Sequence, residues 1–134
     1  MSAAFEILAG RNEPLLLGNI DVVRDWGYAP KYVEAMWLML QHSEPSDFLI
    51  CSGEKCSLRN YVYTLFERLG LDPETQIQTD SSLYRAVDLM EMYGDNNKAR
   101  TKLGWNYSQT TDELIDCLIQ DEHAFRSWSV HRDK

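Results

Sequence analysis

Residues 18–40 read GNIDVVRDWGYAPKYVEAMWLML, and this stretch combines the two kinds of element expected in the chain. The part from Ile20 to Trp26 is predicted to be extended, and Gly27 ends it. Pro30 then suits the first turn of a helix, because its fixed backbone angle matches that position. Apolar side chains continue at helical spacing through Tyr32, Val33, Met36, Trp37 and Leu40. The stretch therefore predicts an extended segment followed by an amphipathic helix.

On both sides of this stretch, short apolar runs and glycine stops predict further helices and short strands. Helices are expected over residues 2–10, 58–69, 96–103 and 110–126, and short strands over residues 15–17, 47–51 and 77–79. The last helix begins with a capping box, since Glu113 follows Thr110 by three residues. The tail from Ser127 to Lys134 is expected to fray. The predicted fold class is therefore mixed α/β, helix-rich with short strands.

The composition predicts one folded domain with an acidic surface. The chain has 134 residues, of which 44% are hydrophobic and 25% are charged, as in ordinary globular domains. This length suits a single lobe covering residues 1–134. The formal net charge of −8 repels phosphate backbones, so no nucleic-acid partner is expected. An anionic ligand must be held by local cations that act against this overall charge.

Membrane, targeting and cysteine signals predict a cytoplasmic protein. No apolar run reaches the length of about 18–20 residues that a membrane span needs, and the N-terminus lacks the pattern of a signal peptide. The three cysteines are odd in number and show no Cys-x-x-Cys spacing, which is typical of free thiols in a reducing compartment. We therefore expect neither a membrane partner nor a metal site.

Two kinds of catalytic machinery are missing from the sequence. None of the seven glycines lies within five residues of another, which excludes the glycine-rich turns that bind dinucleotides or nucleotide phosphates. No tyrosine is followed four positions later by lysine, so a Tyr-x-x-x-Lys acid/base pair is also missing. No catalytic residue and no cofactor-binding residue is therefore predicted.

Two arginines lie within apolar or aromatic sequence: Arg24 in VVRDW and Arg85 in LYRAVD. A guanidinium suits a diphosphate, because its planar fork contacts two oxygens and it stays charged when partly buried. Two arginines from distant positions could clamp one pyrophosphate. The alternative is that Arg24 pairs with Asp25 or Asp21, and Arg85 with Asp88, in surface ion pairs that contribute little. Asp25 is expected to be a structural partner of a backbone N–H or of Arg24 rather than an acid or base.

Several segments together carry a family resemblance. They are residues 18–40, YRAVD at 84–88, GD at 94–95, KARTKLGW at 98–105 and the helix predicted over 110–121. In this order they resemble the C-terminal half of the GDP-mannose 4,6-dehydratases, which belong to the NAD-dependent epimerase/dehydratase branch of the extended short-chain dehydrogenase/reductases. The resemblance covers nearly the whole chain. It implies the small C-terminal lobe of that fold, without its Rossmann domain.

The resemblance implies roles for five residues. Arg24 and Arg85 match contacts to the pyrophosphate of a nucleotide sugar such as GDP-mannose. Asp88 matches the acidic residue that holds the nucleotide ribose, at a position where the family usually has Glu. Leu15 and Leu17 match the strand that passes along the base.

The resemblance also implies a parent reaction, in which NAD(P)⁺ oxidises C4 of the sugar, water is eliminated across C5–C6, and the hydride returns to C6. This chain is expected to be the nucleotide-sugar-binding portion of such a lyase, and to be inactive alone because the cofactor turn and the Tyr-Lys pair belong to the Rossmann domain. The alternative is a stand-alone, non-catalytic module for nucleotide-sugar binding or for oligomerisation. An apolar surface near Trp37 or Leu49 is expected where the Rossmann domain would pack, so that the chain self-associates or pairs with a Rossmann-domain chain.

Overall fold

The structure, a computed structural model, describes residues 1–132 and the side chains of residues 1–129. The helices are α1 (Ser2–Leu8), α2 (Ala29–Gln41), α3 (Leu58–Arg68), α4 (Pro73–Gln76), the 3₁₀ turn η1 (Ser81–Leu83), α5 (Asn97–Leu103) and α6 (Thr111–Arg132). The strands are β1 (Leu15–Leu17), β2 (Val23–Arg24), β3 (Cys56–Ser57), β4 (Ile77–Thr79) and β5 (Glu91–Met92). None of these helices combines enough length with enough apolar character to cross a membrane. The predicted class, mixed α/β and helix-rich with short strands, is confirmed.

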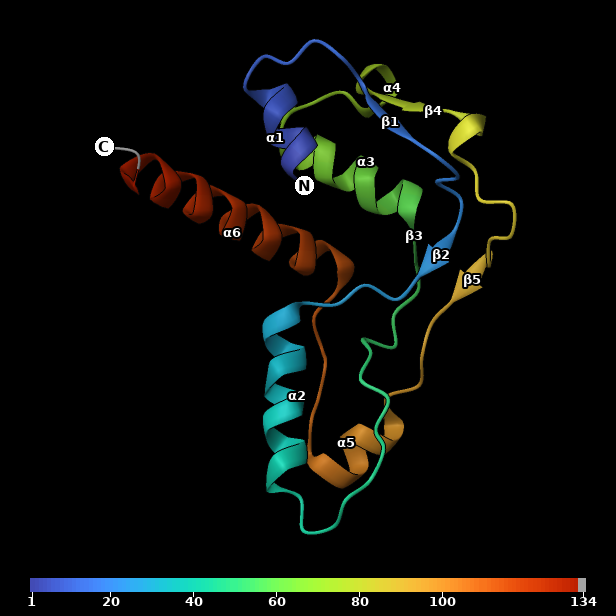
Figure 1. The fold of residues 1–134 in the computed structure, drawn as a ribbon, viewed down its shortest axis with the longest axis vertical. Helices are drawn as coiled ribbons and strands as arrows, with labels where there is room; N and C mark the ends of the chain where they lie inside the picture. The colour runs from blue at the N-terminus through green and yellow to red at the C-terminus, as the bar shows by residue number, and fades with distance from the viewer. Residues whose placement is uncertain (133–134) are drawn as a thin grey trace.

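Within residues 1–132 the strands form two small sheets. β1 pairs in parallel with β4, from Leu15 opposite Ile77 to Leu17 opposite Thr79. In the other sheet β2 is central, antiparallel to β3 and parallel to β5. β2 and β5 lie on the side of the molecule opposite to the end of α6 (Figure 1). The pairing of β2 with β5 brings Arg24 next to a segment that is distant in sequence.

Two hydrophobic cores stabilise the molecule. The upper core in Figure 1 lies where α1, α3 and α6 meet, and Phe66 and Ile115 are fully buried in it. The lower core lies between α2 and α5, where Trp105 packs with Ala35 and Ala99. The two alanines allow these helices to approach each other, because their side chains occupy little volume.

Asp25 joins the end of β2 to two loops. Its carboxylate accepts hydrogen bonds from the amide and the hydroxyl of Ser52, at 2.8 and 2.7 Å. It also accepts hydrogen bonds from the amides of Gly53 and Gly94, at 2.9 and 3.4 Å. The prediction that Asp25 is a structural partner of backbone N–H groups is confirmed.

The turn between β2 and α2 depends on Gly27. A Cβ atom at this position would lie 1.9 Å from the hydroxyl oxygen of Tyr32, so glycine leaves room for that ring. The Tyr32 ring also contacts Trp105 of the lower core, with the ring centroids 6.2 Å apart. Pro30 lies in the first turn of α2, as predicted.

The predicted starts of two helices are confirmed. The side chain of Ser57 accepts a hydrogen bond from the amide of Asn60 and caps α3. At the start of α6, Thr110 Oγ1 accepts from the amide of Glu113 at 3.3 Å, while the Glu113 carboxylate accepts from the amide of Thr110 at 2.8 Å. These reciprocal bonds form the capping box expected from the sequence.

The predicted strand over residues 47–51 is wrong. This segment is irregular, and no described strand runs beside it to provide a hydrogen-bonded ladder. The Asn96 side chain instead donates from Nδ2 to the carbonyl oxygen of Cys51 at 3.1 Å. Phe48 and Ile50 still pack against the lower core, which explains the apolar pattern that predicts a strand.

α6 continues to Arg132 and so includes much of the tail for which the sequence predicts fraying, while residues 133 and 134 lie outside the described part. The hydroxyls of Ser127 and Ser129 donate to the carbonyl oxygens of Ala124 and Arg126, at 2.8 and 2.9 Å. The serine side chains are therefore satisfied within the helix rather than competing with it.

Candidate functional site

Arg24 ends β2, and its guanidinium is bonded to the segment that precedes β5. Its Nη1 atom donates to the carbonyl oxygens of Val23 and Leu89, both at 2.8 Å, and its Nη2 atom donates to Asp88 Oδ1 at 2.9 Å. The ion pair is largely buried, since the side chains of Arg24 and Asp88 are 19% and 21% exposed. Three hydrogen bonds therefore hold the guanidinium in one orientation.

Neither arginine forms an ion pair with the acidic residues that lie next to it in the sequence. Asp25 accepts hydrogen bonds from loop N–H groups, and Asp21 pairs with Arg59 at 2.8 Å. Asp88 pairs with Arg24 rather than with Arg85. The alternative interpretation of Arg24 and Arg85 as ion pairs with their sequence neighbours is therefore wrong.

Arg24, Arg85 and Asp88 line one cavity of about 290 Å³, which we call the Arg24 cavity. Its other lining residues are Gly18, Asn19, Val22, Trp26, Leu58 and Leu83. Arg85 is exposed and has no hydrogen bond or ion pair with any residue that the structure describes. Two guanidinium groups and one carboxylate make the lining positive in a chain whose net charge is −8. Such a local positive charge favours an anionic ligand.

Two further residues shape the walls of the Arg24 cavity, and the sequence prediction of site residues misses both. A Cβ atom on Gly18 would lie 2.9 Å from the carbonyl oxygen of Leu83, so glycine allows the chain after β1 to approach η1. The Trp26 ring stacks on Tyr61, with the centroids 4.8 Å apart, and its Nε1 donates to the carbonyl oxygen of Cys56 at 3.2 Å. The glycine turn after β1 and the tryptophan two positions after Arg24 are the sequence signals that point to these walls.

Leu15 and Leu17 do not line the Arg24 cavity. Both are half-buried in β1, and their side chains pack against the upper core. Their strand contributes to the cavity through Gly18 and Asn19, which follow it directly. The structure thus brings together three of the five predicted site residues and places these two elsewhere.

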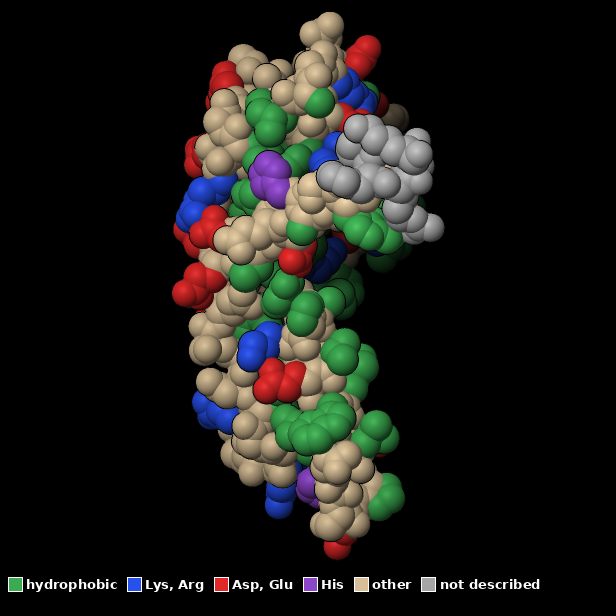
Figure 2. Space-filling view, turned by 90° about the vertical axis from the view of Figure 1, so that its left-hand side faces the viewer, with side chains coloured by type: hydrophobic (Ala, Val, Ile, Leu, Met, Phe, Trp, Pro, Cys, Tyr) green, Lys and Arg blue, Asp and Glu red, His purple; other side chains and the backbone are tan. Residues whose placement is uncertain are grey.

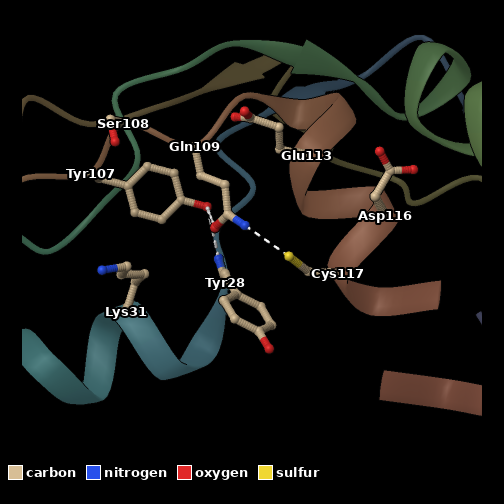
Figure 3. A pocket seen from close by; sticks show the side chains of 8 residues that line it. All are labelled: Tyr28, Lys31, Tyr107, Ser108, Gln109, Glu113, Asp116 and Cys117. Atoms are coloured by element: carbon tan, nitrogen blue, oxygen red, sulfur yellow. Dashed lines mark hydrogen bonds between the residues drawn. The ribbon is translucent and has the colours of Figure 1, made fainter. Parts of the chain in front are cut away.

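A larger cavity, of about 490 Å³, lies between the start of α2 and the first turns of α6 (Figure 3). Its lining residues are Tyr28, Lys31, Tyr107, Ser108, Gln109, Glu113, Asp116 and Cys117. Tyr107 and Cys117 point toward Gln109, whose Nε2 donates to the Cys117 sulfur at 3.1 Å. One lysine and two carboxylates make this lining negative, so it suits a phosphate poorly.

A third cavity, of about 310 Å³, places Cys51 near Asp25. Burial, with a smaller contribution from the Asp25 carboxylate, raises the pKa of the Cys51 thiol. The thiolate is the reactive form of cysteine, so this cavity does not supply an activated nucleophile. Among residues 1–129, no group of three or more His, Cys, Asp or Glu side chains is suited to a metal ion.

The residues of this lobe do not fit a dinucleotide cofactor. In dinucleotide-binding folds, a glycine-rich turn between a strand and a helix lets the backbone approach the cofactor diphosphate. No two glycines of this chain lie within five positions of each other, and the described strands are only two or three residues long. The lobe therefore lacks the cradle that would hold NAD(P).

The fold matches part of two larger solved structures. One is RMD from Pseudomonas aeruginosa complexed with NADPH, which has a TM-score of 0.75 and 22% identity over 90% of this chain and 40% of that chain. The other is dTDP-glucose 4,6-dehydratase from Bacillus anthracis in complex with NAD, with a TM-score of 0.76 and 17% identity over 93% of this chain and 39% of that chain. The fold is that of part of an extended short-chain dehydrogenase/reductase, of the epimerase/dehydratase kind.

Within this fold class, the chain can be assigned to one family. The model of the family described as GDP-mannose 4,6 dehydratase matches residues 1–118. The chain belongs to the GDP-mannose 4,6-dehydratase family, as the sequence resemblance predicts.

Relatives in this family are longer than the chain. The GDP-mannose 4,6 dehydratase of Cricetulus griseus is 38% identical over 132 residues, which cover 86% of this chain and 36% of that protein. The Homo sapiens enzyme of the same name is 37% identical over 131 residues, which cover 85% of this chain and 35% of that protein. The chain spans about a third of the length of these relatives.

Proposed function

We propose that this chain is the nucleotide-sugar-binding part of a GDP-mannose 4,6-dehydratase-like protein, and that the Arg24 cavity takes the diphosphate of the nucleotide sugar. The observation that carries this proposal is the convergence of Arg24 and Arg85 on one cavity of a strongly acidic chain. Both residues lie within residues 1–118, the range that the family model matches. A guanidinium fork suits diphosphate oxygens, and two of them can neutralise much of the ligand charge.

The three polar residues of the cavity have different roles in this proposal. Arg24 is the fixed contact, because its Nη1 atom is already held by two carbonyl oxygens. Its Nε–H and one Nη2–H are not used by those bonds or by the Asp88 bond, and remain for phosphate oxygens. Arg85 is the mobile contact, because it is exposed and unpaired among the described residues. Asp88 accepts hydrogen bonds from the ribose hydroxyls.

The whole protein, in this proposal, converts GDP-mannose to the 4-keto-6-deoxy sugar with NAD(P). The cofactor and the acid/base pair belong to a Rossmann domain, so we propose that this lobe alone is inactive and binds no NAD(P). All three cysteines are free thiols, which supports the expected cytoplasmic location.

An exposed apolar stripe on α2 supports pairing with such a Rossmann domain. Its members lie at positions i, i+3, i+4 and i+7 and are 56–81% exposed: Val33, Met36, Trp37 and Leu40. Figure 2 shows apolar side chains gathered on the lower part of the face that carries α2. Apolar stripes of this kind are normally covered by a partner. Without the Rossmann domain, we expect this lobe to self-associate through the stripe.

Light scattering coupled to gel filtration tests this pairing surface. The apparent mass should rise with concentration, and Trp37→Glu should reduce the rise. Phe125→Glu is the matched control, because Phe125 on α6 is as exposed as Trp37, at 59% against 60%. A monomer at every concentration, or equal effects of both variants, would count against the stripe.

Calorimetric titration tests the binding proposal. We expect saturable binding of GDP and GDP-mannose, weaker binding of UDP-glucose and none of NAD⁺. Arg85→Ala should weaken GDP binding by about 1.5–3 kcal/mol, the range for hydrogen bonds to charged groups. Arg100→Ala is the control, since Arg100 is an exposed arginine of α5 outside the Arg24 cavity. Absence of binding by GDP and GDP-mannose, or an Arg85→Ala affinity equal to that of the control, would overturn the proposal.

A further inference from the structure

We infer that Asp88 makes the Arg24 cavity selective against phosphates that carry no sugar hydroxyls, by keeping a negative charge beside Arg24. This inference rests on the proposed function, because it concerns the ligand class of the same cavity. It assigns Asp88 a second role, which is to exclude inorganic phosphates and diphosphate.

The Arg24 guanidinium is held in a fixed position beside Asp88. Its Nη1 atom is bonded to the carbonyl oxygens of Val23 and Leu89, so the guanidinium cannot turn away without losing two hydrogen bonds. Its Nη2 atom is 2.9 Å from Asp88 Oδ1. Any anion that contacts the free edge of this guanidinium therefore lies close to the Asp88 carboxylate.

Water screens the charges of Arg24 and Asp88 only weakly. The side chains of Arg24 and Asp88 are about four-fifths buried, with exposed fractions of 19% and 21%. Charges that are largely removed from water interact more strongly than charges at the surface, and salt screens them less. An inorganic diphosphate bound at Arg24 would meet this repulsion and has few protons to donate to the carboxylate.

A nucleoside diphosphate avoids this repulsion. Arg85 lines the same cavity and has no partner within the described part of the chain, so it is available for phosphate oxygens. A nucleoside diphosphate has, besides its phosphates, two ribose hydroxyls that donate hydrogen bonds. When these hydroxyls face Asp88, the carboxylate attracts the ligand instead of repelling it.

The experiment compares inorganic diphosphate, GDP and 2′,3′-dideoxy-GDP by calorimetry at fixed ionic strength, on the wild type and on Asp88→Asn. The asparagine keeps the shape of the side chain and a carbonyl oxygen for Arg24 Nη2, but removes the charge. We expect Asp88→Asn to bind inorganic diphosphate at least tenfold more tightly than the wild type. The preference for GDP over inorganic diphosphate should fall at least tenfold in the variant.

Asp47→Asn is the charge-matched control, because Asp47 is exposed and lies beside Lys98 of α5, outside the Arg24 cavity. The wild type alone gives a further measurement that does not depend on the folding of a variant. It should bind dideoxy-GDP at least tenfold more weakly than GDP.

The outcomes separate the two proposals. If the wild type binds GDP but Asp88→Asn leaves the affinity for inorganic diphosphate within twofold, the selectivity role is wrong and the proposed function stands. Equal wild-type affinities for GDP and dideoxy-GDP would also overturn the selectivity role. If Asp88→Asn gains inorganic diphosphate binding while neither protein binds GDP or GDP-mannose, the proposed function is wrong and the charge effect of Asp88 is supported.

Discussion

The Arg24 side chain joins β2 to the segment before β5 and also lines the Arg24 cavity. Its guanidinium links β2 to residues 88–89 just before β5, so removing it breaks three hydrogen bonds and leaves Asp88 without its cationic partner. A buried carboxylate that loses its partner destabilises the fold, because its charge is no longer compensated.

We predict that Arg24→Ala lowers the free energy of unfolding by about 1.5–3 kcal/mol, the range for hydrogen bonds to charged groups. Arg85→Ala should change it by less than about 0.5 kcal/mol, as expected for an exposed side chain without partners among the described residues. Urea titrations of both variants measure the difference. Equal losses of stability would contradict the role of Arg24 in joining β2 to the segment before β5.

Tyr32 makes the stability of the fold depend on pH in the alkaline range. Burial, with a smaller contribution from the Asp25 carboxylate, raises the pKa of Tyr32 to about 12. The unfolded chain ionises this group near its ordinary value of about 10, so the folded state holds the proton more tightly. The contribution to stability is complete below about pH 10 and is lost as the pH rises through about 12.

Tyr32→Phe should therefore flatten the decline of stability between about pH 10 and 12. Urea midpoints across this range measure the slope for the wild type and the variant. A slope that is the same in both would show that Tyr32 does not contribute to the decline.

At the scale of single residues, the sequence predicts which charged side chains line the cavity better than it predicts which residues they bond to. The two arginines and Asp88 are identified from their surroundings and the family motifs, and one cavity holds all three. The Arg24–Asp88 pair spans 64 positions, and local spacing gives no information about such contacts. Leu15 and Leu17 share the apolar pattern of any core strand, so the pattern does not show that they face the upper core rather than the cavity.

At the scale of elements, the Asp25 side chain connects the end of β2 to two loops that are distant from it in the sequence. Its carboxylate accepts bonds from Ser52, Gly53 and Gly94, which belong to two loops. We predict that Asp25→Ala lowers the free energy of unfolding by about 2–3 kcal/mol, because several donors lose a charged acceptor. Hydrogen exchange at the amides of Ser52 and Gly53 should accelerate in parallel.

Asp21→Ala is the matched control for this prediction. Asp21 lies just before β2 and is exposed in its ion pair with Arg59. Exposed pairs contribute less than about 1 kcal/mol, so the loss should be small. If the two aspartate variants lose the same stability, the connecting role of Asp25 is contradicted.

Helices are predicted more successfully than strands at this scale. Helix starts depend on local signals, such as the Ser57 cap of α3 and the Thr110–Glu113 capping box of α6, and these signals are visible in the sequence. A strand depends on a neighbour that the sequence does not reveal. Residues 47–51 have an apolar pattern typical of a strand, yet no described strand pairs with them.

The whole molecule combines two cores with a cavity that lies away from the exposed α2 stripe in the fold. β2 carries Arg24 toward the segment before β5, whereas α2 packs against the lower core and leaves Trp37 exposed. Substrate binding and domain pairing thus use different surfaces in the proposed function. Variants of Trp37 should therefore alter self-association without altering GDP affinity, as gel filtration and calorimetry on the same sample will measure.

The central claim, that a nucleotide sugar binds in the Arg24 cavity, is tested most directly by NMR. Amide chemical shifts of the ¹⁵N-labelled chain would be followed while GDP-mannose is added. Saturable shifts should concentrate at Gly18, Asn19, Arg24 and Arg85, which line the Arg24 cavity. Shifts confined to the residues of the larger cavity between α2 and α6, or no saturable shifts at all, would contradict the claim.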